Sequence, residues 1–262
     1  MTAKILTWPN APKHVGIMAS KTIVLLRGLL RERRHWGDFL ACLQQKLPES
    51  RLVTLDIPGN GALCHALSPS AISGITDTLR TRVETKPLTL VTLSMGGMIA
   101  LDWMHRYPAD INRAILINTS ARPHAPFYWR LRWRNYAVLL SLLWQAPAAR
   151  EKLILSLTSN RHQHDAKLLA RWQNWQRQNP VTTQNALRQI LAAATFKARQ
   201  KPQAPLLLIA SRHDRLVDYR CSRKLATAWD ACYQEHSWGG HDLPLDDPNW
   251  LAETIASWLL QP

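Results

Sequence analysis

Cysteine is scarce in this chain and follows no functional pattern. The four cysteines are Cys42, Cys64, Cys221 and Cys232, and no two of them have the Cys-x-x-Cys spacing of metal sites and redox motifs. The sequence therefore predicts neither a zinc site nor a disulfide framework, and we interpret all four as ordinary thiols in a reducing compartment.

Long hydrophobic runs are also missing. The stretch up to His14 is mixed in character and broken by proline, so it lacks the form of a secretory signal. The apolar run from Ile23 to Leu30 contains Arg27 and is too short to span a bilayer. We therefore expect a cytoplasmic protein that is at most peripheral to the membrane.

Acidic residues are few, because 18 Asp and Glu stand against 33 Lys and Arg and give a net charge of +15. This imbalance suits an anionic partner. No nucleic-acid-binding motif accompanies it, and basicity alone does not predict such binding, so nucleic acid is not an expected partner.

The sequence does contain apolar, β-prone runs that alternate with helix-forming segments. We expect an edge strand at 4–7, strands at 22–26, 52–56, 88–92, 114–118 and 205–211, and helices at 35–47 and 71–83 and up to Tyr107. A last short strand is expected from Cys232 onwards, with His236 within it. This alternation predicts an α/β fold with a mostly parallel central sheet flanked by helices. A length of 262 residues suits one such core with a modest insertion.

The alternation stops after Ser120. Residues 121–199 have helical character without a buried strand, and a stretch of this length must carry secondary structure of its own. We therefore predict a core formed by residues 1–120 and 200–262, with a helical cap inserted at residues 121–199.

The predicted cap carries most of the charge. Between Arg122 and Arg199 there are thirteen Lys or Arg and two acidic residues, which accounts for +11 of the total. Tryptophans at positions 129, 133, 144, 172 and 175 fall in the same segment. Helical spacing of Trp172 and Trp175 is typical of packing, with the arginines on the solvated face. Arg mixed with Trp is also typical of a surface that attracts anions, and Trp129, Trp133, Trp172 and Trp175 are candidate lining residues.

Ser94 is the best candidate nucleophile. It ends the apolar run that begins at Leu90, and Gly96 and a helix-forming segment follow. A serine on a tight strand-to-helix turn presents its hydroxyl above the sheet edge, although Thr92 stands where this motif usually has glycine. Taken alone, the pattern also fits a strand that ends in a turn.

Candidate partners follow Ser94 in the order that such a turn requires, with an acid before a histidine. Asp214 lies just past a buried strand, and His241 follows two glycines in a turn near the end of the chain. His213 and His236 are alternatives, as are the acids Asp242 and Asp246, and Asp214 could instead be a turn or capping residue. We prefer Asp214 as the acid, because Asp242 and Asp246 lie too close to His241 in sequence. We prefer His241 as the base, because His236 falls within a predicted strand.

Together these motifs resemble the α/β-hydrolase superfamily, in its cap-bearing, serine esterase-like branch, which includes the esterases of pimeloyl-carrier-protein methyl ester. Two further segments carry the resemblance: residues 23–30 resemble the oxyanion loop, and residues 53–61 resemble the Asp-x-Pro-Gly-x-Gly turn. The resemblance implies that the backbone N–H groups of Leu29 and Met95 form an oxyanion hole, with Gly28 shaping the loop. Arg27 replaces the histidine usual before that glycine, and it would line the pocket.

The resemblance implies a serine hydrolase that cleaves a carboxylic ester through an acyl-enzyme, without metal or organic cofactor. The same triad would serve a thioesterase or an acyltransferase. A rival interpretation, supported by Thr92 and Arg27, is a catalytically impaired binding protein that docks an anionic partner. The expected substrate is a small-molecule or carrier-linked acyl ester, and the candidate partners are an acidic carrier protein and an anionic membrane surface.

Overall fold

A parallel sheet of six strands forms the centre of the molecule in the computed structural model, which describes residues 22–141, 144–198 and 200–261. The strand order is β2-β1-β3-β4-β5-β6, and every neighbouring pair is parallel. The strands are β1 (Thr22–Leu26), β2 (Arg51–Leu55), β3 (Leu88–Leu93), β4 (Ile111–Ile117), β5 (Leu206–Ser211) and β6 (Cys232–His236). The predicted α/β fold is therefore confirmed. The edge strand expected at residues 4–7 lies outside the described residues.

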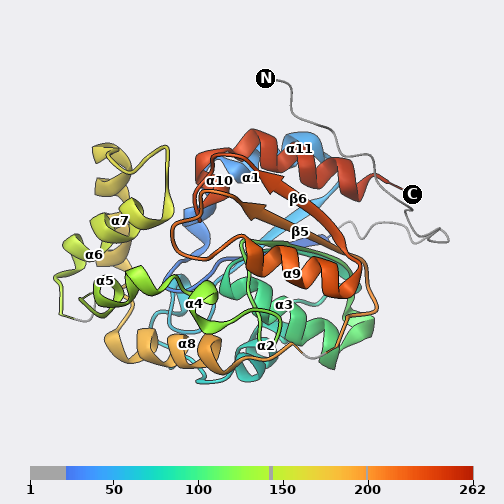
Figure 1. The fold of residues 1–262 in the computed structure, drawn as a ribbon, viewed down its shortest axis with the longest axis horizontal. Helices are drawn as coiled ribbons and strands as arrows, with labels where there is room; N and C mark the ends of the chain where they lie inside the picture. Colours follow the sequence, from blue (N-terminus) through green and yellow to red (C-terminus); the bar gives the residue numbers. More distant parts are fainter. Residues whose placement is uncertain (1–21, 142–143, 199, 262) are drawn as a thin grey trace.

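Helices cover both faces of the sheet (Figure 1). One face packs against α1 (Phe39–Lys46) and α11 (Pro248–Leu259), and the other against α2 (Ile72–Arg80), α3 (Met95–Arg106) and α9 (Arg220–Trp229). Successive strand residues alternate between the two cores, as Val24 and Leu26 face α3 while Ile23 and Leu25 face α1. The central strands β1, β3 and β5 are buried along their whole length and are mostly apolar, because both of their faces are covered.

The helix expected at 35–47 starts later than the sequence pattern indicates. His35 belongs to a short 3-10 helix, η1 (Arg33–Trp36), and the chain turns at Gly37 before α1 begins at Phe39. The Nδ1 atom of His35 lies 3.2 Å from the carbonyl oxygen of Glu32, within the turn itself. A side chain that bonds to its own turn competes with a regular helix at that point.

Three other short elements connect the core. They are η2 (Gly61–Leu63), η3 (Pro108–Asp110) and α10 (Leu243–Asp246). Among the described residues, no helix is both long enough and apolar enough to cross a membrane.

Between β4 and β5 the chain forms a run of helices, and we call residues 121–199 the insertion. The helices described in the insertion are α4 (Phe127–Arg130), η4 (Trp133–Asn135), α5 (Tyr136–Ser141), α6 (Pro147–Thr158), α7 (Ala166–Gln178) and α8 (Thr183–Thr195). In Figure 1 the arrows of β5 and β6 point towards the side where α5, α6 and α7 lie. The division of the chain into a core and a cap at residues 121 and 199 stays a prediction.

Candidate active site

Ser94 occupies a strained turn between β3 and α3. Its backbone has φ 58° and ψ −120°, a conformation that a residue with a Cβ adopts rarely. Strain of this kind costs on the order of 1–3 kcal/mol and persists where the surroundings enforce it. Here the Ser94 N–H donates to the carbonyl of Ile117 in the neighbouring strand, at 2.9 Å.

Two glycines allow the chain to close around this turn. A Cβ on Gly96 would lie 2.6 Å from the carbonyl oxygen of Leu26, so the start of α3 sits directly against the end of β1. A Cβ on Gly28 would lie 2.9 Å from the Cβ of Ser94 and 3.3 Å from its Oγ. The loop after β1 therefore touches the candidate nucleophile, and a side chain at Gly28 would not fit there.

Asp214 and His241 meet at the same edge of the sheet. The Nδ1 atom of His241 lies 2.7 Å from Oδ2 of Asp214, and both side chains are buried. The other oxygen, Oδ1, accepts the N–H groups of Leu216 and Val217 at 2.7 and 2.9 Å. A carboxylate fixed in this way accepts a hydrogen bond from Nδ1–H, which leaves Nε2 of His241 as the nitrogen that can accept a proton.

Two consecutive residues after β4 connect the serine turn to the histidine loop. Thr119 donates its hydroxyl to the carbonyl of Ser94 at 2.9 Å. Asn118 donates its amide to the carbonyl of His241 at 2.9 Å, and its oxygen accepts the Ser211 N–H at 2.7 Å. Neither residue was predicted from the sequence. The signal was available, since both are polar and directly follow a buried strand at the functional edge of the sheet.

The two backbone groups expected to bind an oxyanion come from the two segments around Ser94. Met95 is the first residue of α3, so its N–H has no carbonyl partner one turn back in the helix. Leu29 directly follows Gly28, in the loop that touches Ser94. Neither position needs a particular side chain, because the donors belong to the main chain.

Arg27, which was expected to line the pocket, lies buried beside the loop that carries His241. Its guanidinium is buried in the core, where two nitrogens donate to the two carboxylate oxygens of Asp242 at 2.9 and 2.6 Å, and it lies over the ring of Trp36. Asp242 follows His241 directly in the chain. The ion pair thus connects the loop after β1 to the loop that carries His241, and this role was not predicted.

Thr92 is accommodated without disturbing the turn. Its side chain is fully buried, and the hydroxyl donates to the carbonyl of Ile115 in β4 at 3.0 Å. The polar group that replaces the usual glycine is therefore satisfied by the neighbouring strand.

The alternative histidines and acids of the sequence analysis occupy other places in the fold. His236 lies buried between Trp238 and Trp250, and its Nε2 is 3.2 Å from Asp247. His213 is exposed. Asp246 accepts the N–H groups of Gly240 and Asn160 at 2.7 and 2.9 Å, so it fixes the glycine turn before His241. The C-terminal end of α6 takes part as well, because the carbonyl of Thr158 accepts the N–H of Asp242 at 2.8 Å.

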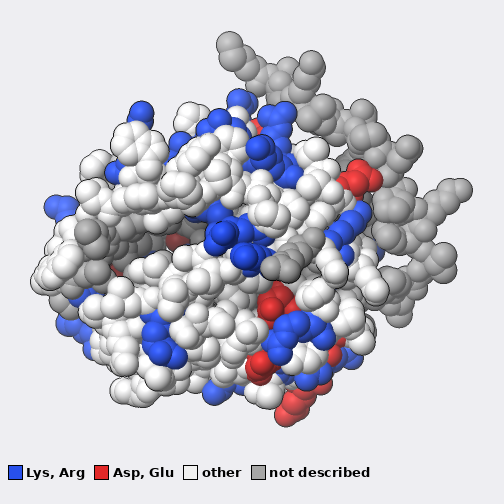
Figure 2. Space-filling model, turned by 60° about the horizontal axis from the view of Figure 1, so that its bottom comes forward, with Lys and Arg blue, Asp and Glu red and all other residues white. Residues whose placement is uncertain are grey.

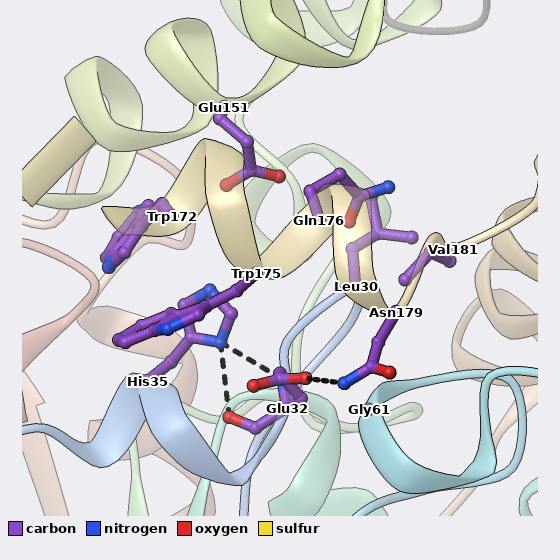
Figure 3. A pocket seen from close by; sticks show the side chains of 10 residues that line it. All are labelled: Leu30, Glu32, His35, Gly61, Glu151, Trp172, Trp175, Gln176, Asn179 and Val181. Atoms are coloured by element: carbon purple, nitrogen blue, oxygen red, sulfur yellow. Dashed lines mark hydrogen bonds between the residues drawn. The ribbon is translucent and has the colours of Figure 1, made fainter. Parts of the chain in front are cut away.

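Of the four candidate tryptophans, Trp172 and Trp175 line a small cavity between α7 and η1 (Figure 3). Its volume is about 10 Å³, room for about one water. In Figure 3, Glu151 enters from one side while His35 and Glu32 enter from the opposite side. Glu151 is bound to Arg31 at 2.8 Å, and Arg31 also lies over the Trp172 ring, so this cluster fastens α6 and α7 to the core.

Burial lowers the pKa of His35 well below its usual value, and the neighbouring Arg31 guanidinium lowers it further. Nε2 of His35 lies 3.1 Å from a nitrogen of Arg31, which can only donate, so the imidazole is neutral and accepts at Nε2. A neutral histidine in this position avoids adding a fourth cation beside Arg27, Arg31 and Arg34.

Trp129 and Trp133 lie elsewhere on the insertion. Trp129 is partly buried beside Arg220 and Lys224, whereas the side chain of Trp133 is 63% exposed. The four tryptophans therefore do not form one lining, and only two of them share a cavity among the described residues.

Comparisons with known proteins identify a hydrolase family. Residues 71–242, which include Ser94, Asp214 and His241, match the Hydrolase_4 family, described as serine aminopeptidase, S33. The chain is 24% identical over 261 residues to the putative carbamate hydrolase RutD of Caulobacter segnis, covering 96% of this chain and 93% of that protein. It is 25% identical to the biotin biosynthesis bifunctional protein BioHC of Teredinibacter turnerae over 91% of this chain, but it spans only 44% of that protein.

Among solved structures, the enol-lactonase of Burkholderia xenovorans LB400 has a similar fold. The TM-score is 0.75 at 20% sequence identity, and the match covers 94% of this chain and 93% of that structure. This similarity concerns the arrangement of the chain in space.

Proposed function

Because the chain belongs to the serine aminopeptidase, S33 family of hydrolases, we propose that it is a serine hydrolase that cleaves a carboxylic ester through an acyl-enzyme on Ser94. The bond between His241 and Asp214, at the sheet edge where Ser94 takes its strained turn, carries this proposal. A protein that only binds a partner has no chemical reason to keep this constellation.

The reaction would proceed in two halves. In the first, the Ser94 oxygen attacks the ester carbonyl carbon while Nε2 of His241 takes the hydroxyl proton, and Asp214 stabilises the resulting imidazolium. The N–H groups of Leu29 and Met95 would bind the oxyanion, each contributing on the order of 3 kcal/mol to the transition state. The leaving alkoxide then receives the proton from His241.

In the second half, His241 removes a proton from water as the water oxygen attacks the acyl carbon. The carboxylic acid product leaves, and the Ser94 hydroxyl is restored. This chemistry is common to esters, thioesters, lactones and carbamates, so the pocket and its charge decide the substrate.

Charge favours a neutral or anionic acyl substrate over one with a free amino group. An aminopeptidase must receive an ammonium group, which carboxylates bind best. Two carboxylates, Glu151 and Glu32, line the small cavity beside Trp172 and Trp175. Both are already paired, since Glu151 is bound to Arg31 and Glu32 is bound to Arg34. Between Arg122 and Arg199 the only other carboxylate is Asp165, which accepts the N–H of Leu168.

A fluorophosphonate probe tests the nucleophile directly. We expect stoichiometric labelling of the folded protein, which Ser94→Ala abolishes. Ser50→Ala is the matched control, because Ser50 precedes β2 at the opposite edge of the sheet and keeps its backbone bond to Leu47. No labelling of the folded wild-type chain would refute the proposal.

A substrate series then tests the charge preference. Half-esters of dicarboxylic acids, neutral esters of the same length and aminoacyl amides would be compared by kcat/KM. We expect the half-esters and neutral esters to be cleaved and the aminoacyl amides to be poor substrates. Preference for the aminoacyl amides would contradict the assignment and favour a peptidase.

A further inference from the structure

Two long stretches of the chain contain no carboxylate. Residues 120–150 contain five Lys or Arg and no Asp or Glu, and residues 166–213 contain eight Lys or Arg and no Asp or Glu. A merely solvated protein surface usually carries both signs of charge. The absence of one sign therefore needs an explanation in what this surface meets.

The two stretches lie side by side in the structure. Arg130 in α4 donates to the carbonyls of Ala193 and Ala194 at the end of α8, at 2.6 and 3.2 Å. The N–H of Ala198 donates to the carbonyl of Arg122 at 2.7 Å, which adds a short parallel bridge between the segments. In Figure 1, α4 lies next to α8 on the same side of the molecule.

This part of the surface also exposes large apolar side chains. Phe127 is 70% exposed and Trp133 is 63% exposed. On α8 the spacing of Leu187, Ile190 and Leu191 places them on one stripe of the helix, and all three are exposed. Exposed apolar side chains grouped in this way indicate a surface that is covered in use.

A positively charged groove adjoins α4. It has a volume of about 460 Å³ and is lined by His124, Trp129, Arg220, Arg223, Lys224, Thr227 and Ala228. Arg220 is paired with Asp218 at 2.8 Å, but no described carboxylate lies within 4.0 Å of the charged groups of Arg223 or Lys224. These two cations are free to meet an external anion.

Figure 2 shows the distribution of charge on this side of the molecule. Lys and Arg are scattered over the left half of the view and gather near its middle, whereas Asp and Glu lie mostly in the right half. In the left half, red is seen only inside a hollow. The outer surface there thus offers cations and uncharged groups.

We propose that this surface, which we call the basic apolar face, binds an anionic lipid bilayer. It consists of Arg122, Phe127, Tyr128, Trp133, Arg134, Leu187, Ile190, Leu191, Arg223 and Lys224. Cationic side chains attract anionic headgroups, while aromatic and aliphatic side chains enter the boundary between headgroups and acyl chains. A bilayer satisfies both kinds of side chain at once and needs no matching shape, whereas an acidic protein would need pockets for each exposed ring.

Its position suits delivery of a lipid-soluble ester, and in that respect the inference rests on the proposed function. The N–H of Asp218 donates to the carbonyl of Trp129, and the N–H of Arg132 donates to the carbonyl of Leu216, both at 2.9 Å. These bonds join α4 and the residues just after it to the loop that follows Asp214. The basic apolar face is therefore built directly on the loop of the catalytic acid.

Vesicle co-sedimentation of the full chain tests the proposal, with Ser94→Ala used to prevent turnover. We expect binding to vesicles that contain phosphatidylglycerol, little binding to pure phosphatidylcholine, and weaker binding at high salt. Neutralisation by Arg134→Gln or Arg223→Gln should weaken partitioning about fivefold for each cation removed. Phe127→Ser with Trp133→Ser should also weaken it, with circular dichroism to confirm folding.

Matched controls lie away from this face. Arg51 is an exposed arginine at the start of β2, on the sheet edge opposite the catalytic residues, and Leu260 is 72% exposed after α11. Arg51→Gln and Leu260→Ser should leave vesicle binding unchanged. Equal losses in the controls, or no preference for phosphatidylglycerol, would overturn the proposal.

Binding to a polyglutamate column without binding to vesicles would also overturn it, and would assign the face to an acidic protein. Failure of the proposed function is a separate result, because it is read from fluorophosphonate labelling and not from sedimentation.

Discussion

Removal of the Arg27 charge should destabilise the protein and slow its reaction together. In Arg27→Met, the long side chain still packs over Trp36, but the Asp242 carboxylate is left buried at 2% exposure without its partner. Because Asp242 follows His241 directly, a shift of that carboxylate towards water moves the backbone of His241, the proposed base.

The magnitude follows from the burial of both groups. Breaking a buried ion pair by removing one partner costs about 3–5 kcal/mol, whereas replacing both partners by neutral groups is often close to neutral. We therefore expect Arg27→Met to lose about 3–5 kcal/mol of unfolding free energy. The double variant Arg27→Met with Asp242→Asn should recover more than about 2 kcal/mol of this loss, because the free-energy changes of substitutions at two contacting residues do not add.

Urea unfolding followed by circular dichroism measures the stability, and ester hydrolysis measures kcat/KM. The control is Arg33→Met, because the Arg33 side chain is 57% exposed and its Nε lies as far as 4.0 Å from Asp56. Loss of this weak ion pair should cost less than about 1 kcal/mol. If Arg27→Met does not fold, Arg27→Lys keeps the charge without the two-point contact and should be intermediate. Additive losses in the double variant, or a loss as small as that of the control, would refute the reasoning.

Three further predictions concern the site and its surroundings. Asp214→Asn should lower kcat by about 10⁴-fold while the fold is kept, because His241 loses the partner that fixes its tautomer. A changed KM with an unchanged kcat would contradict this. Gly28→Ala should reduce fluorophosphonate labelling, since the new Cβ would lie 2.9 Å from the Cβ of Ser94, and unchanged labelling kinetics would show that the loop yields. Because the pKa of His35 is lowered in the native state, acidification protonates this imidazole in the unfolded chain before it does so in the folded protein. Its contribution to stability is therefore complete above about pH 6.5 and falls as the pH drops towards the native pKa, by at most about 1.4 kcal/mol per pH unit. Unfolding measured between neutral and acidic pH should show a shallower slope in His35→Phe than in wild type, and an identical slope would exclude His35 as the source.

The sequence is sufficient to predict the sheet and the order of its candidate site residues. Buried parallel strands are apolar on both faces, so the runs at 22–26 and 205–211 stand out from any helix of similar length. Ser94 and Asp214 each follow such a strand, His241 follows the half-buried edge strand β6, and parallel strands bring their carboxyl ends to one edge. Local patterns were enough because each signal lies within a few residues.

Contacts between distant segments were not predictable in the same way. Arg27 and Asp242 are 215 positions apart, and nothing in either neighbourhood indicates the other. The tryptophans of the insertion show a related difficulty, because helical spacing identifies an apolar stripe without indicating what covers it. Trp172 proved to be buried against the core while Trp133 is exposed.

The bonds around His241 also connect the insertion to the proposed base. The loop that carries His241 is held by Asn118 from the core, by Arg27 through Asp242, and by the carbonyl of Thr158 at the end of α6. The first two contacts are side-chain bonds within the core, whereas the third comes from a helix of the insertion. A displacement of α6 would therefore remove one of the supports of the loop that carries His241, because the N–H of Asp242 would lose its acceptor. A partner that moves the insertion can change the rate through this bond without touching Ser94.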